Sequence, residues 1–135
     1  MSTPPPRFNI VDSSAWLAYL ADEPAAADFA AAIEDTANLV VPTICLLEVF
    51  KVVARVRGER EALQTVAVMQ QGTVVDLDAD LALSAARLAG QHRLPLADSV
   101  IYATTMRFHG TLWTQDDDFQ GLPQVRYVPK GVIGG

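Results

Sequence analysis

Several acidic residues in this chain interrupt apolar sequence or follow strand-like runs, where solvated carboxylates are not expected. They are Asp12, Glu48, Asp98 and the run Asp116, Asp117 and Asp118. A buried carboxylate without a partner costs several kcal/mol, so such acids are hydrogen-bonded, paired or bound to a cation. All-oxygen ligation suits Mg²⁺ or Mn²⁺, and no His cluster or Cys pair favours zinc. The pattern therefore predicts a divalent-metal site of the kind that handles phosphate groups.

Each of these acids also has a purely structural explanation. Asp12 follows the strand-like residues 8–11 and could cap the helix after it. Glu48 lies on an apolar helix face, where Lys51 could pair with it. Asp98 falls in a first helical turn, where capping and the helix dipole favour an acid. One or two members of the run 116–118 could lie in a solvated turn.

The metal-site interpretation requires elements that bring these segments to one place. Strands are expected at residues 8–11, 39–41, 73–75, 111–114 and 126–128. Helices are expected at residues 15–20, 25–33, 43–57, 59–71, 79–91 and 96–108. Thr43 and Asp78 are expected as helix N-caps and Gly58 as a helix stop.

Short apolar strands separated by helices predict a parallel sheet covered on both faces, that is, an α/β, doubly wound fold. In such a sheet the carboxyl ends of the strands form the ligand-binding edge. Asp12 and Asp116 both follow predicted strands, and the helices that carry Glu48 and Asp98 begin at that edge. We therefore expect the four acids to meet there.

Composition limits the class of protein further. The chain has 135 residues, of which 50% are hydrophobic and 19% charged, and a net charge of −6. This predicts one domain over residues 1–135, with a flexible Pro-rich leader at 1–7 and a flexible tail at 131–135. A single cysteine and no signal-peptide pattern suggest a cytoplasmic protein, and no apolar stretch approaches the length of a membrane helix. The acidic balance argues against non-specific binding of duplex DNA.

The motifs resemble the PIN domain, and within it the VapC type of toxin ribonuclease. The resemblance rests on Ile10-Val11-Asp12-Ser13-Ser14, on Glu48 in a long helix, on Leu96-Ala97-Asp98-Ser99 and on Thr114-Gln115-Asp116-Asp117-Asp118-Phe119. It covers residues 8–128. It implies a five-stranded parallel sheet in the order 3-2-1-4-5 and an endoribonuclease that depends on Mg²⁺ or Mn²⁺. It also implies inhibition by a small antitoxin protein.

Carried over by position, the resemblance makes Asp12, Glu48, Asp98 and Asp116 the catalytic and metal-binding acids. It adds Asp118 as a supporting metal ligand. Ser14 and Thr114 correspond to hydroxyl residues that orient carboxylates or waters. Asp117 adds a charge to the usual family motif, which here spans Thr114 to Phe119. The individual roles of Asp116, Asp117 and Asp118 stay open.

The implied reaction is hydrolysis of RNA by metal-activated water, which leaves 5′-phosphate and 3′-OH ends. Scattered cations would grip the RNA phosphates; the candidates are Lys51, Arg55, Arg57, Arg87, Arg93 and Arg107. Two predicted helices carry more apolar surface than a small sheet can cover. The residues concerned are Trp16, Leu17, Leu20, Val49, Phe50 and Val53. Core packing is the default explanation for them, and a homodimer face or an antitoxin groove are the alternatives.

Two other functions use some of the same residues. A receiver-type phosphoacceptor switch would place Asp12 near a metal, Asp76 as the acceptor, and Thr114 and Lys130 as the switching pair. It leaves Glu48 and Asp98 unexplained. A catalytically silent PIN-like binding module is the other alternative, although the four acids are all present.

Overall fold

A five-stranded, all-parallel sheet forms the centre of the molecule. The structure is a computed structural model that describes residues 6–131. Its strands are β1 (Asn9–Val11), β2 (Leu39–Pro42), β3 (Thr73–Val75), β4 (Thr111–Thr114) and β5 (Val125–Tyr127). They lie in the order β3-β2-β1-β4-β5. The predicted fold class and strand order are confirmed, and the order reverses between β1 and β4, as the prediction of a ligand-binding edge requires.

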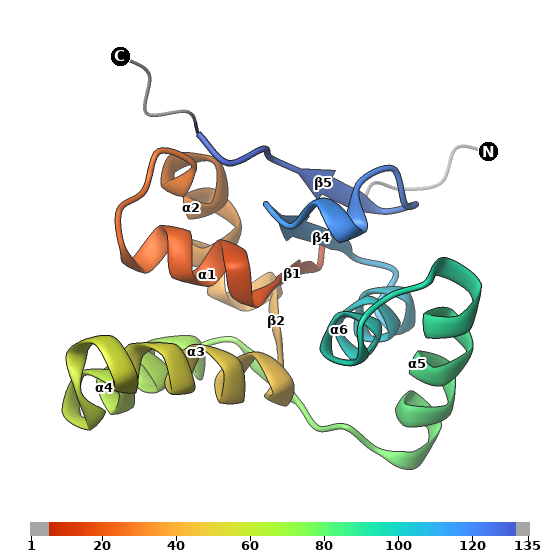
Figure 1. Ribbon diagram of the computed structural model, residues 1–135, viewed down its shortest axis with the longest axis horizontal. Helices are drawn as coiled ribbons and strands as arrows, with labels where there is room; N and C mark the ends of the chain where they lie inside the picture. The colour runs from red at the N-terminus through yellow and green to blue at the C-terminus, as the bar shows by residue number, and fades with distance from the viewer. Residues whose placement is uncertain (1–5, 132–135) are drawn as a thin grey trace.

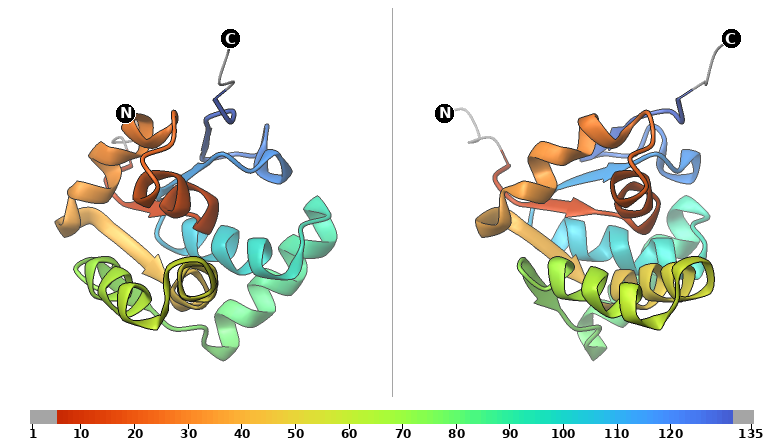
Figure 2. Two further views of the ribbon diagram at one scale, coloured as in Figure 1. Left: turned by 60° about the vertical axis from the view of Figure 1, so that its left-hand side comes forward. Right: turned by 90° about the vertical axis from the view of Figure 1, so that its left-hand side faces the viewer.

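Helices cover both faces of this sheet. They are α1 (Ser13–Leu20), α2 (Ala26–Glu34), α3 (Thr43–Arg57), α4 (Glu59–Met69), α5 (Ala79–His92) and α6 (Leu96–Arg107), with short 3-10 turns η1 (Thr36–Asn38) and η2 (Asp117–Phe119). Figure 1 shows α1 and α2 on one side of β1 and α6 on the other. In both views of Figure 2, α3 and α4 lie side by side. Helices α1 and α3 begin directly after β1 and β2, at the carboxyl edge of the sheet, and the first turn of α6 lies beside the segment that follows β4.

The helix boundaries follow local chemistry, with one prediction wrong. Asp78 caps α5 by accepting a hydrogen bond from the backbone N–H of Leu81 at 2.8 Å, as predicted. Gly58 ends α3 with a φ of 94°, a conformation that favours glycine. Thr43 is not an N-cap, because it is already the first residue of α3. Pro42 precedes the helix instead, and its ring fixes a compatible φ of −63°.

The core lies between the sheet and its helices. The strand residues Ile10, Val11 and Val41 are fully buried, as are the larger side chains of Trp16 and Tyr102. Core packing therefore accounts for Trp16. Val49 in α3 is also fully buried, whereas Leu17, Phe50 and Val53 are half-buried and Leu20 is exposed.

Two other predictions concern membrane helices and the ends of the chain. Within residues 6–131, no helix has the length and hydropathy needed to cross a membrane. The leader predicted at residues 1–7 and the tail predicted at 131–135 fall mostly outside the residues that the structure describes.

Candidate metal centre

Asp12 is a buried carboxylate held by three hydrogen bonds at the end of β1. Its Oδ1 accepts from the Ser14 hydroxyl at 2.7 Å and from the backbone N–H of Ala15 at 3.0 Å. Its Oδ2 accepts from the Thr114 hydroxyl at 2.7 Å. The bond from Ala15 caps α1, so the structural alternative for Asp12 is realised. The cap does not account for the remaining two bonds, which fix the carboxylate at the point where the strand order reverses.

Three other acids gather beside this point. Oxygen atoms of Asp98, Asp116 and Asp118 all lie within 4.8 Å of one another. Asp98 comes from the first turn of α6, but Pro95 precedes that helix and no side chain caps it. Asp116 and Asp118 flank the start of η2, where Asp116 Oδ1 accepts from the backbone N–H of Asp118 at 2.9 Å. Asp98 is therefore not a cap, but it does lie in the first turn of α6, where the helix dipole favours an acid.

Glu48 reaches the site from the second turn of α3. Its Oε1 accepts a hydrogen bond from the Ser13 hydroxyl at 2.6 Å. This contact connects the first residue of α1 to α3. Lys51 forms no ion pair with Glu48 in the described part of the chain. The glutamate is thus oriented by a neutral hydroxyl rather than by a cation.

Thr114 joins Asp12 to the Asp116 segment. Its fully buried hydroxyl donates to Asp12 Oδ2 and accepts from the backbone N–H of Asp116 at 2.9 Å. A hydroxyl that donates to one carboxylate and accepts from the next segment fixes their relative position. The orienting roles predicted for Ser14 and Thr114 fit these hydrogen bonds.

Burial and mutual repulsion together raise the pKa values of two of these acids. Burial and, after it, the charges of Asp116 and Asp12 raise the pKa of Asp98 to about 7, with smaller effects from Asp118 and Glu48. Burial also raises the pKa of Asp12 to about 6 against the lowering effect of its hydrogen bonds. The acids therefore lie close enough to repel one another, as the sequence predicts for a shared edge.

A cation would relieve this repulsion. The close carboxylate oxygens of Asp98, Asp116 and Asp118 are ligands of the kind that Mg²⁺ and Mn²⁺ prefer. The buried Cys45 nearby does not offer a thiolate, because burial raises the pKa of its thiol and the charges of Asp12 and Glu48 raise it further. The residues present therefore fit a hard divalent cation.

Two residues of the site were not singled out by sequence reasoning. Ser13 positions Glu48, and Gln115 is a buried polar residue whose side-chain amide donates to the Ser14 carbonyl at 3.5 Å. The only signal in the sequence was the run of polar residues directly after β1 and after β4. Asp117, whose role stayed open, does not belong to the group of close carboxylates.

This arrangement does not fit the receiver alternative. A receiver sheet has the order 2-1-3-4-5, which places its third strand beside the first. Here β2 lies between β1 and β3, so Asp76, which follows β3, is two strands away from Asp12. Asp98 and Glu48, which that alternative left unexplained, lie at the site.

The predicted RNA-gripping cations are dispersed. Arg107 forms a bidentate ion pair with Asp78 at 2.9–3.0 Å. Lys51 lines an apolar groove between α3 and α4. The remaining candidates are exposed on α3 and around α5: Arg55, Arg57, Arg87 and Arg93. The structure does not gather these cations into one basic surface.

The fold and the site together define a class of protein. It is a doubly wound α/β protein with several carboxylates at the edge of the sheet where the strand order reverses. The sequence identifies the family, because residues 10–124 match the PIN domain. The chain belongs to the PIN domain family, and the predicted membership is confirmed. No curated relative matches this chain.

Solved toxin structures share the fold. A chain of a toxin–antitoxin complex from Klebsiella pneumoniae has a TM-score of 0.73 at 19% identity, covering 87% of this chain and 95% of that chain. A Mycobacterium tuberculosis VapC toxin that cleaves the sarcin–ricin loop has a TM-score of 0.72 at 20% identity, covering 87% and 96%. A DNA-bound VapBC complex from Salmonella typhimurium has a TM-score of 0.69 at 14% identity, covering 90% and 97%.

Proposed function

We propose that this protein is a metal-dependent endoribonuclease of the VapC type, acting in the cytoplasm as the toxin of a toxin–antitoxin pair. The observation that carries the proposal is the convergence of Asp98, Asp116 and Asp118 within 4.8 Å, beside the buried Asp12 and the oriented Glu48. Membership of the PIN family and the fold shared with VapC toxins support it.

The catalytic acids are Asp12, Glu48, Asp98 and Asp116, with Asp118 as an additional metal ligand. A bound Mg²⁺ or Mn²⁺ would supply an activated water and neutralise charge on the attacked phosphate. The chain's own residues then have defined tasks. Ser14 and Thr114 hold Asp12, Ser13 holds Glu48, and Asp98 loses its proton more readily once a cation offsets its acidic neighbours.

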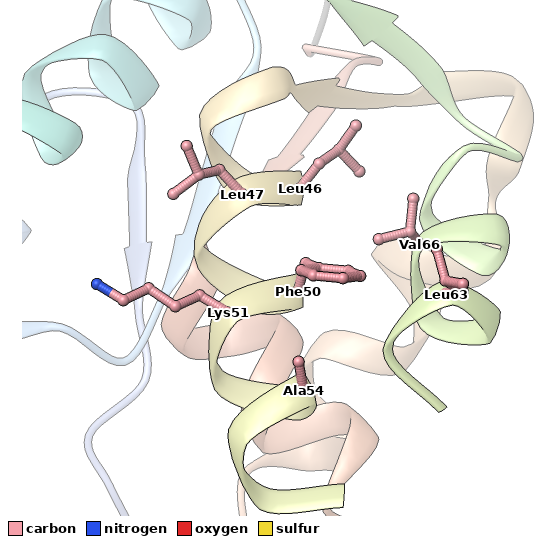
Figure 3. A pocket seen from close by; sticks show the side chains of 7 residues that line it. All are labelled: Leu46, Leu47, Phe50, Lys51, Ala54, Leu63 and Val66. Carbon is pink, nitrogen blue, oxygen red and sulfur yellow. The ribbon is translucent and has the colours of Figure 1, made fainter. Parts of the chain in front are cut away.

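An antitoxin is the expected inhibitor, and α3 and α4 offer a surface for it. A groove of about 660 Å³ between these helices is lined by Leu46, Leu47, Phe50, Lys51, Ala54, Leu63 and Val66. Figure 3 shows the side chains of Phe50 and Val66 approaching one another across this groove. Leu47 and Leu63 are 59% and 57% exposed, and they belong to one contiguous apolar surface along this groove, a feature that often marks an interaction site. An apolar segment of the antitoxin would cover them. A homodimer also remains a prediction.

The test of the nuclease uses purified, antitoxin-free protein on single-stranded RNA with Mn²⁺, with Mg²⁺ and with EDTA. We expect cleavage only with metal, and its loss in Asp12→Asn and Asp98→Asn. Asp28→Asn, an exposed acid on α2, serves as the matched control and should cleave normally. The new ends should be 5′-phosphate and 3′-OH, because water attacks rather than the 2′-OH. Cyclic 2′,3′-phosphate ends would contradict this chemistry.

A catalytically silent binding module is the remaining alternative. It predicts that the folded protein binds Mn²⁺ or a partner but cleaves no RNA under any of these conditions. The presence of all four predicted catalytic acids favours the ribonuclease over this alternative.

A further inference from the structure

A cavity of about 510 Å³ adjoins the candidate metal centre and shares residues with it. Ser14 and Asp116 line this cavity, and they also belong to the hydrogen-bonded site described above. Its size falls within the range of roughly 300–1,000 Å³ that is common for small-ligand sites. A nucleotide in this cavity would lie directly beside a phosphate held at the acids. We call this cavity the side pocket.

Asp117 lines the side pocket, and the acid cluster leaves it unused. The oxygens that approach within 4.8 Å of one another belong to Asp98, Asp116 and Asp118. Asp117 sits between two of these residues in sequence, but η2 turns it into the side pocket instead. A carboxylate in such a place can only accept hydrogen bonds.

The side pocket also contains an aromatic ring and a cation. Tyr127 is half-buried at the end of β5, where it pairs in register with Thr114 of β4. An aromatic ring on which a base can stack stabilises the binding of single strands. Lys130 lines the same cavity and forms no ion pair among residues 6–131. It therefore offers a charge for a backbone phosphate, which the acidic surroundings otherwise repel.

We propose that the side pocket binds one unpaired nucleotide of the RNA next to the cleaved phosphate and selects guanine there. Tyr127 stacks on the base, Lys130 contacts a phosphate, and Asp117 accepts hydrogen bonds from the base edge. Guanine fits best, because its Watson–Crick edge presents the N1–H and N2–H₂ donors side by side to a single carboxylate. Adenine and the pyrimidines do not offer two adjacent donors. This inference rests on the proposed ribonuclease function.

The experiment maps cut sites of the full-length protein in a random-sequence, single-stranded RNA library with Mn²⁺. Sequencing the 5′-phosphate ends gives the base frequency at each position around the cut. We expect guanine to be enriched about tenfold at one fixed position adjacent to the cut, the discrimination that one good bidentate pair provides. Asp117→Asn should abolish this enrichment, because an amide replaces one acceptor oxygen with a donor.

Further variants separate base selection from metal binding. Asp117→Asn should leave the affinity for Mn²⁺ unchanged, whereas Asp118→Asn should lower it. Tyr127→Ala and Lys130→Ala should raise KM with little change in kcat, and Tyr127→Phe should retain the wild-type KM because it keeps the ring. Arg60→Ala, an exposed cation on α4, is the control for loss of charge.

The possible results distinguish this inference from the function on which it rests. Guanine enrichment that Asp117→Asn removes supports the inference. Wild-type cleavage without guanine enrichment, or with the same enrichment in Asp117→Asn, overturns it and leaves the ribonuclease intact. Absence of any metal-dependent cleavage by the wild type overturns the ribonuclease and the inference together.

Discussion

Replacing Thr114 by valine removes the hydroxyl that connects Asp12 to the Asp116 segment while keeping the shape of the side chain. The hydroxyl donates to Asp12 Oδ2 at 2.7 Å and accepts from the backbone N–H of Asp116 at 2.9 Å. Because Thr114 is fully buried, water does not replace either bond. The variant should therefore fold with a buried carboxylate that has lost one donor.

The stability that Thr114→Val removes depends on pH, because the charge of Asp12 depends on pH. The pKa of this carboxyl in the folded protein is about 6, above its ordinary value of 3.8. Metal-free stability therefore falls as the pH rises through 6, since the folded state holds a proton that the unfolded chain releases earlier. Valine should raise this pKa further. A hydrogen bond to a charged group contributes about 1.5–3 kcal/mol and a neutral one about 1 kcal/mol, so Thr114→Val should cost about 1.5 kcal/mol more at pH 8 than at pH 5.

Urea unfolding in EDTA at the two pH values measures this difference. Thr105→Val is the matched control, because Thr105 is equally buried but its hydroxyl donates to the Ile101 carbonyl within α6. Its cost should be the same at both pH values. The reasoning is refuted if Thr114→Val costs no more at pH 8 than at pH 5, or if the two variants respond to pH alike.

Three further predictions concern the metal, the groove and the packing of the sheet. Mn²⁺ at 100 times its Kd at pH 8 should stabilise the protein by about 2.7 kcal/mol at that pH. The same Mn²⁺ concentration should stabilise it less at pH 5, because protons on Asp98, with a pKa of about 7, compete with the ion. Equal stabilisation at both pH values in thermal unfolding would contradict it. Leu47→Asp should leave the free energy of unfolding in urea unchanged, since the side chain is 59% exposed. The same variant should fail to copurify with a coexpressed antitoxin. Normal copurification would exclude the groove as the antitoxin-binding surface. Gly110→Ala should destabilise the protein by more than about 1 kcal/mol, because the added Cβ would lie 2.9 Å from the Phe8 carbonyl oxygen. In Gly90→Ala the added Cβ meets nothing within 4 Å, so this variant in α5 should be more stable by about 0.5–1 kcal/mol. Equal unfolding midpoints for the two variants would refute the packing argument.

The architecture was predictable because its signals are local. Short apolar strands such as residues 8–11 and 39–41, each followed by a helix, allow few arrangements other than a parallel sheet. The strand ends then place Asp12 and Asp116 at one edge. The exact order of the strands came from the resemblance to the PIN domain rather than from the strands themselves.

The finer structure of the site was not predictable, because it depends on contacts between distant segments. The bond from Ser13 to Glu48 exists only because α1 packs beside α3, and no local pattern reports that packing. The division among Asp116, Asp117 and Asp118 depends on how the 3-10 turn η2 directs each side chain. Thr43 was mistaken for a cap because the preceding proline already provides an extended residue at the helix start.

The most direct test of the central claim is the position of Mn²⁺ in crystals of the antitoxin-free protein soaked with MnCl₂ at pH 8. The account predicts an anomalous peak among the carboxylates of Asp98, Asp116 and Asp118, on the side that faces Asp12, and no such peak in Asp98→Asn. A protein that cleaves RNA with Mn²⁺ but holds the ion away from these acids, or keeps the same peak in Asp98→Asn, would contradict it.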